Sequence, residues 1–91
     1  MLKSTHVKTS NEGFFSVYDF EEINDVLEIH EHTDNTSHYS VVTNGMLQMF
    51  NESGNIKKLT PGIIEKIPMN YKHGFRALTK DARLVNIPYK D

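Results

Sequence analysis

The 91-residue sequence contains no cysteine. Disulfide bonds, thiolate metal sites, iron–sulfur clusters and cysteine nucleophiles are therefore excluded. No apolar run approaches the roughly 20 residues that a membrane-spanning helix needs. The first residues also lack the apolar centre of a signal peptide. We therefore expect a soluble, cytoplasmic protein.

The sequence also has no large excess of positive or negative charge. The formal net charge is −2, with acidic and basic residues interspersed along the chain. Because there is neither a basic run nor a basic stripe, we expect no nucleic-acid partner and no membrane partner. A chain of this length makes one domain with a small core, which a metal ion or a partner subunit would help to stabilise.

No window has a convincing apolar period of 3.6 residues, and only 19–26 leaves room for a helical turn. Short stretches rich in β-branched and aromatic residues instead alternate with turn residues, which predicts an all-β sandwich or barrel. We expect residues 1–13 to be an N-terminal arm or an edge strand, and residues 14–91 to form the single barrel domain. The predicted strands are 14–20, 26–33, 38–43, 46–50, 56–59, 63–68, 71–78 and 82–89.

A His-x-His pair lies on the predicted strand 26–33. Successive strand residues face opposite sides, so His30 and His32 share a face about 6–7 Å apart. That spacing lets two imidazoles converge on one metal ion, for which histidine is the commonest protein ligand. Glu28 shares this face and is a candidate to orient one imidazole, whereas Leu27 and Ile29 face the other side.

The segment 24–87 resembles the cupins, small RmlC-like β-barrels in which two sequence motifs carry the metal ligands. The first motif, G-x5-H-x-H-x3,4-E-x6-G, is represented by Asn24, His30, His32, His38 and Gly45. The second motif, G-x5-P-x-G-x2-H-x3-N, is represented by Gly62, Pro68, Asn70, His73 and Ala77. The resemblance implies a jelly-roll barrel, the double-stranded β-helix of the cupins.

Four positions depart from the motifs in informative ways. Asn24 and Asn70 stand where the family has glycine, and asparagine is one of the few other residues that tolerate positive φ. We therefore expect positive φ at both. His38 replaces the glutamate ligand after a bend that is one residue longer, and Ala77 replaces the final asparagine.

The resemblance implies a metal site made by His30, His32, His38 and His73, with Asp34 as the alternative to His38 as the fourth ligand. Four neutral imidazoles leave a divalent ion with a net charge of about +2, which favours anionic or chelating ligands. Such a site disfavours Mg²⁺ and Ca²⁺, so we expect Fe, Mn, Ni, Zn or Cu. If the ion is tetrahedral zinc, the four side chains close the site and make it structural.

Three functions are compatible with these residues. The first, which the cupin resemblance implies, is a metalloenzyme of the dioxygenase, isomerase, decarboxylase or lyase class acting on a small anionic or chelating organic molecule. The second is a non-enzymatic module that binds a metal or a small ligand, and the third is a barrel without a metal. Tyr71 is two residues before His73 on the same predicted strand, so the two side chains face the same side. Tyr71 is therefore a candidate proton donor or base, with a buried core role as the alternative. We also expect a homodimer, because small barrels expose an apolar sheet edge and outer face.

Overall fold

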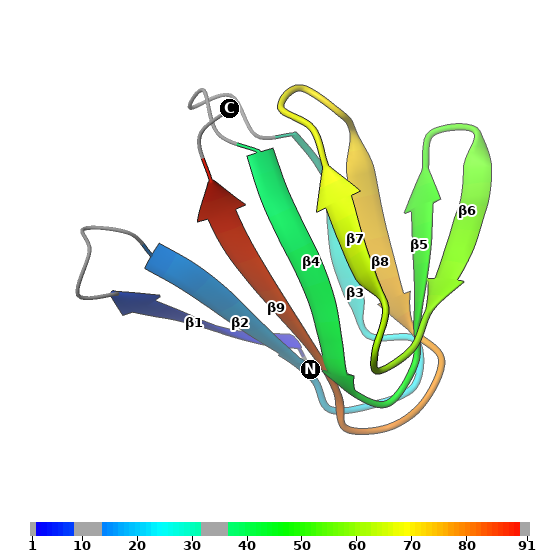
Figure 1. The fold of residues 1–91 in the computed structure, drawn as a ribbon. Helices are drawn as coiled ribbons and strands as arrows, with labels where there is room; N and C mark the ends of the chain where they lie inside the picture. Colours follow the sequence, from blue (N-terminus) through cyan, green and yellow to red (C-terminus); the bar gives the residue numbers. More distant parts are fainter. Residues whose placement is uncertain (1, 9–13, 32–36, 90–91) are drawn as a thin grey trace.

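Nine β-strands and no helix make up the described part of the chain, residues 2–8, 14–31 and 37–89, in a computed structural model (Figure 1). No helix within these ranges is therefore long and apolar enough to cross a membrane. The predicted all-β class is confirmed. The strands are β1 (Leu2–Lys8), β2 (Phe14–Phe20), β3 (Val26–His30), β4 (Ser37–Asn44), β5 (Leu47–Asn51), β6 (Gly54–Leu59), β7 (Ile64–Ile67), β8 (His73–Ala77) and β9 (Ala82–Tyr89).

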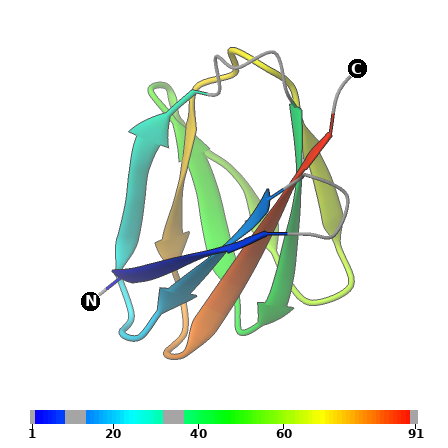
Figure 2. The ribbon, with the colours of Figure 1, turned by 90° about the vertical axis from the view of Figure 1, so that its left-hand side faces the viewer.

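The strands form two antiparallel sheets that face each other (Figure 2). The five-stranded sheet has the order β1-β2-β9-β4-β7, and the four-stranded sheet has the order β3-β8-β5-β6. Neighbours in each sheet come mostly from distant parts of the sequence, as in a jelly roll. This topology places β4 in one sheet and β3 and β8 in the other, so residues on these strands can meet between the sheets.

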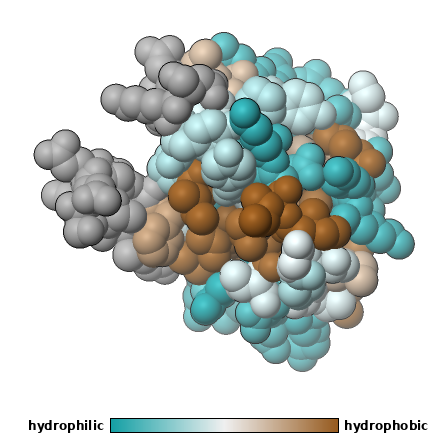
Figure 3. All heavy atoms as spheres, viewed as in Figure 1, coloured by the Kyte–Doolittle hydropathy of each residue, from teal (hydrophilic) through white to brown (hydrophobic). Residues whose placement is uncertain are grey.

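The hydrophobic core lies between the two sheets. Along β9, Ala82, Leu84 and Asn86 are buried, whereas Arg83 and Ile87 are exposed, which is the alternation expected of a strand with one face inward. Apolar side chains also reach the outer surface of the five-stranded sheet (Figure 3). The buried hydrophobic residues are Phe20, Val42, Leu47, Met49, Leu59, Ile67, Phe75, Ala77, Ala82 and Leu84.

A register irregularity in β3 changes which residues face the core. Leu27 is paired with Phe75 and His30 with His73, with a bulge between the two pairs. Paired residues on neighbouring strands point to the same side, and both Phe75 and His73 are fully buried. Leu27 and His30 therefore both face inward. The prediction that they face opposite sides was wrong, because a bulge adds a residue and shifts the alternation.

The two motif asparagines have the predicted backbone conformation, with φ of 72° at Asn24 and 66° at Asn70. The motif glycines Gly45 and Gly62 also have positive φ, 71° and 96°. Each of the four lies in or beside a turn that reverses the chain between strands. The asparagines can therefore take the place of glycine without changing the path of the backbone.

The N-terminal segment contributes an edge strand, one of the two alternatives predicted for it. β1 pairs with β2 along its whole length and forms one edge of the five-stranded sheet. Residues 9–13 lie outside the described part of the chain. The segment 19–26 ends β2 and continues into a turn closed by a 3.1 Å hydrogen bond from the Asp25 N–H to the Glu22 carbonyl, without a helix.

Candidate metal centre

His30 and His73 lie side by side on β3 and β8. They are register partners, and their ring centroids are 4.4 Å apart with the planes at 57°. His73 is completely buried, and its ring meets the edge of Phe75 at a centroid distance of 5.5 Å. The structure thus brings together one histidine from each of the two motifs, although they are 43 positions apart in the sequence.

Main-chain hydrogen bonds orient both imidazoles in the same way. The Nδ1–H of His30 donates to the Glu28 carbonyl at 2.8 Å, and the Nδ1–H of His73 donates to the Tyr71 carbonyl at 2.7 Å. A carbonyl oxygen can only accept, so the proton of each neutral ring is on Nδ1. Each ring then has its lone pair on Nε2, the form in which histidine coordinates metals.

The third histidine, His38, comes from β4 in the opposite sheet. It is paired in register with Pro88 and with Ile67, and Ile67 is fully buried, which places the side chain of His38 on the inner face as well. His38 itself is half-buried. Both sheets therefore contribute imidazoles to the space between them.

The electrostatics of His73 reflect these neighbours. Burial lowers the pKa of His73 from 6.5 to about 4. The hydrogen bond to the Tyr71 carbonyl opposes this shift, and repulsion from protonated His30 and His38 adds to it. His73 is therefore neutral over the physiological range, as a metal ligand must be.

The lowered pKa of His73 predicts a pH-dependent stability of the metal-free protein. Between pH 6.5 and 4 the unfolded chain binds a proton at this residue and the folded chain does not, so the unfolding free energy falls as the pH falls. Each unit of pKa difference is worth about 1.4 kcal/mol, which gives a loss of roughly 3 kcal/mol across this window. Urea unfolding of protein treated with EDTA measures it. His73→Gln should remove this part of the dependence, and an unchanged dependence in that variant would contradict the assignment.

The metal site as predicted extends beyond the described residues. His32 and Asp34 both lie outside them, so the choice between Asp34 and His38 as a ligand stays a prediction. Within 2–8, 14–31 and 37–89, no three histidine, aspartate or glutamate side chains are grouped closely enough to hold a metal ion by themselves. The donors that are in place, His30 and His73, have the ring tautomer that suits Fe, Mn, Ni, Zn or Cu.

Two further candidate residues act through their backbones. Tyr71 is 37% exposed, and its ring is stacked beside that of His73 at 6.3 Å. The Tyr71 carbonyl oxygen accepts the hydrogen bond from His73, and the Glu28 carbonyl oxygen accepts the one from His30. The proposed role of the Glu28 carboxylate in orienting an imidazole is therefore filled by the main chain.

One contact near the site had no signal in the sequence. The Met69 N–H donates to the hydroxyl of Ser37 at 3.3 Å, and Ser37 is 1% exposed. This bond ties the start of β4, next to His38, to the turn that precedes His73. A serine at the start of a strand is too common to predict such a contact.

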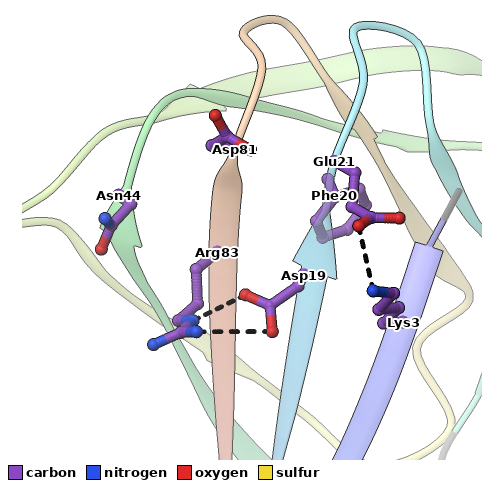
Figure 4. Close-up of a pocket in the computed structure, with 7 residues that line it drawn as sticks. All are labelled: Lys3, Asp19, Phe20, Glu21, Asn44, Asp81 and Arg83. Atoms are coloured by element: carbon purple, nitrogen blue, oxygen red, sulfur yellow. Dashed lines mark hydrogen bonds and ion pairs between the residues drawn. The ribbon is translucent and has the colours of Figure 1, made fainter.

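A cavity of about 320 Å³ lies far from His38 (Figure 4). Asn44 lines it at the end of β4, six residues and roughly 20 Å along the strand from His38. Both of its basic side chains are ion-paired, Arg83 with Asp19 at 2.7 Å and Lys3 with Glu21 at 3.1 Å. The cavity therefore has no uncompensated positive charge with which to attract an anionic molecule. Its lining residues are Lys3, Asp19, Phe20, Glu21, Asn44, Asp81 and Arg83.

Comparison with solved structures identifies the fold. An RmlC-like cupin from Desulfovibrio desulfuricans superposes with a TM-score of 0.80 at 22% sequence identity, covering 94% of this chain and 80% of that one. This chain has the cupin fold. A cupin superfamily protein from Desulfitobacterium hafniense gives 0.78 at 14% identity, over 100% of this chain and 79% of that chain. KdgF from a Halomonas species gives 0.80 at 20% identity, over 96% and 76%.

Comparisons of the sequence alone find no matching protein-family model and no matching curated protein. The cupin assignment therefore rests on the structure and on the spacing of the two motifs. In this cupin barrel the first motif covers β3 and β4, and the second covers β7 and β8. The motifs meet where His30 is paired with His73.

Proposed function

We propose that this cupin binds a divalent transition metal through His30, His32, His38 and His73, and acts on a small anionic or chelating organic molecule. The main support is the adjacency of His30 and His73, each with its Nδ1–H held by a backbone carbonyl. Two imidazoles with the same fixed tautomer, on neighbouring strands and one of them fully buried, are a suitable arrangement for binding a shared cation.

The bound metal would supply Lewis-acid or redox chemistry to the organic molecule. The protein residues would hold the ion, keep His73 neutral and surround the site with apolar side chains such as Phe75 and Ile67. Among the described residues, the buried polar side chains are Ser37, Ser40, Gln48, His73 and Asn86, with no lysine or arginine. A negative charge on the ligand would therefore be attracted mainly by the metal site, which favours compact molecules with two oxygen donors close together.

The proposed chemistry covers several reaction classes. Dioxygenases, isomerases, decarboxylases and lyases all use a metal to polarise or activate a small chelating molecule. The fold does not separate these classes, because one fold supports many activities. The alternative is a non-enzymatic module in which the same four histidines bind a metal or a small ligand without turnover.

Metal content distinguishes these alternatives. Protein made without a histidine tag would be analysed for metals before and after supplementation with Fe²⁺, Mn²⁺, Ni²⁺, Cu²⁺ and Zn²⁺. We expect about one redox-active or exchangeable ion per chain. One tightly held zinc per chain would favour a structural site, and no metal even after supplementation would overturn the proposal.

A further inference from the structure

The inner face of the five-stranded sheet carries a row of polar side chains. Ser16, Asn86, Ser40 and Glu65 are successive register partners on β2, β9, β4 and β7. Asn86 and Ser40, at the centre of this polar row, are 2% and 0% exposed, so the row faces the space between the sheets. Polar groups at such positions lose their contacts with water on folding, and apolar residues are more common there.

The polar row lies between the hydrophobic core and the histidines. Two residues along the strands in one direction are Leu84 and Val42, which are register partners buried in the core. Two residues along β4 in the other direction is His38. His38 is a diagonal neighbour of Asn86, and diagonal neighbours have Cα atoms roughly 7–8 Å apart. The apolar lining between the sheets therefore becomes polar one step away from a candidate metal ligand.

The hydrogen bonds of the polar row leave one donor group without an acceptor, the amide nitrogen of Asn86. Glu65 is ion-paired with Lys57 at 3.1 Å. The Ser40 hydroxyl donates to Oδ1 of Asn86 at 2.5 Å. Nδ2 of Asn86 has no hydrogen-bond partner within residues 2–8, 14–31 and 37–89. Polar atoms of buried side chains are usually hydrogen-bonded, so the Nδ2–H groups mark a place for an acceptor.

We propose that the Asn86 amide donates a hydrogen bond to the organic molecule held at the metal, and that Ser40 positions the amide for this contact. The inference rests on the proposed function and adds a second polar group to the molecule that binds there. Because Ser40 already donates to Oδ1, the side chain of Asn86 presents N–H donors to the ligand. It therefore selects a carboxylate or carbonyl oxygen and not an N–H group.

The offset between Asn86 and His38 limits the size of the molecule. One end would chelate at the histidines, and the acceptor oxygen would lie near Asn86, one step along the strands. A two-carbon acid such as oxalate has all its oxygens close together and is too short to make both contacts. A hydroxy or keto dicarboxylate of four or five carbons has the necessary length, which makes this the substrate class that the polar row favours.

Two α-hydroxy acids of the same configuration test this contact. L-malate has a distal carboxylate, and (S)-2-hydroxybutanoate has a methyl group in its place. Calorimetry would measure the affinity of the Ni²⁺-loaded protein for each acid. The positive metal site favours the more highly charged malate in every variant, so the decisive quantity is the change in the ratio of the two affinities. Asn86→Leu should lower the malate-to-hydroxybutanoate ratio about 10- to 100-fold. Ser40→Ala should lower it less, because the amide is kept but can rotate.

Asn55→Leu is the matched control. Asn55 is exposed on β6 and belongs to neither motif, so this variant should keep the wild-type affinity ratio. Metal content, measured on every variant, separates this inference from the proposed function. An unchanged ratio in a folded, Ni²⁺-loaded Asn86→Leu variant would overturn the inference and leave the proposed function standing. So would a wild-type protein that binds Ni²⁺ but neither acid. A wild-type protein that binds no metal would overturn both.

A crystal structure of the wild-type protein with Ni²⁺ and L-malate gives a second readout that does not depend on the variants folding. We expect an oxygen of the distal carboxylate within about 3.2 Å of Nδ2 of Asn86. The Ser40 hydroxyl should still donate to Oδ1 in this complex. A distal carboxylate that contacts solvent or other residues instead of Asn86 would overturn the proposal.

Discussion

His73→Ala is expected to abolish metal binding at micromolar metal concentrations while leaving the barrel folded. The binding free energy of a structural zinc site with four ligands is about 10–16 kcal/mol, or roughly 3–4 kcal/mol for each ligand. The loss of one imidazole should therefore weaken the affinity for the metal by about 100- to 1000-fold. His30→Ala should have a similar effect, because its ring lies 4.4 Å from that of His73. Metal stoichiometry by elemental analysis and affinity by calorimetry would measure both.

The fifth histidine provides the control for this experiment. His6 belongs to neither motif, so His6→Ala removes an imidazole without removing a predicted ligand. Its metal content should equal that of the wild-type protein, and circular dichroism should show the same β-sheet spectrum for all three variants. Full metal stoichiometry in both His30→Ala and His73→Ala would refute the site.

Gly45→Ala is expected to destabilise the protein by about 3–5 kcal/mol, a large part of the roughly 5–15 kcal/mol that stabilises a domain of this size. The residue has φ of 71°, which costs an alanine about 1–2 kcal/mol. The new Cβ would also lie 2.5 Å from the Thr79 hydroxyl and 2.9 Å from the Ala82 Cα. Thr79 cannot easily move away, because its hydroxyl accepts a 3.0 Å hydrogen bond from the Met46 N–H.

Gly62→Ala separates the two causes. Gly62 also has positive φ, 96°, but an added Cβ would meet nothing within 4 Å. This variant should lose only about 1–2 kcal/mol, so thermal unfolding should show a much smaller drop in melting temperature than for Gly45→Ala. Equal drops would mean that backbone conformation alone explains the cost at Gly45.

The sequence predicted most of this architecture because its turn residues are clear. Asn-Gly at 44–45, Pro-Gly at 61–62 and the motif asparagines each mark a place where the chain reverses. Between them the β-branched and aromatic stretches had to be strands. The predicted strand 82–89 agrees with β9 at both ends, and His30 of the first motif lies beside His73 of the second, as the resemblance implied.

The side of the sheet on which each side chain lies was predicted less well. The bulge in β3 has no glycine or other marker in Val26–His30, so simple alternation placed Leu27 on the wrong side. The apolar row on the outside of the five-stranded sheet could not be predicted either, because its members Val17, Val41, Ile64 and Val85 are scattered through the sequence. They become one row only when the strand order β2-β9-β4-β7 is known.

The oxygen atoms that orient His30 and His73 belong to the main chain at positions 28 and 71. Every amino acid supplies such an oxygen, so exchange of the side chain at either position leaves the imidazole orientation intact. Selection at these two positions can therefore act on other properties, such as charge around the barrel opening, without disturbing the ligand geometry. A mutational scan would find both positions tolerant although they lie against the candidate metal ligands.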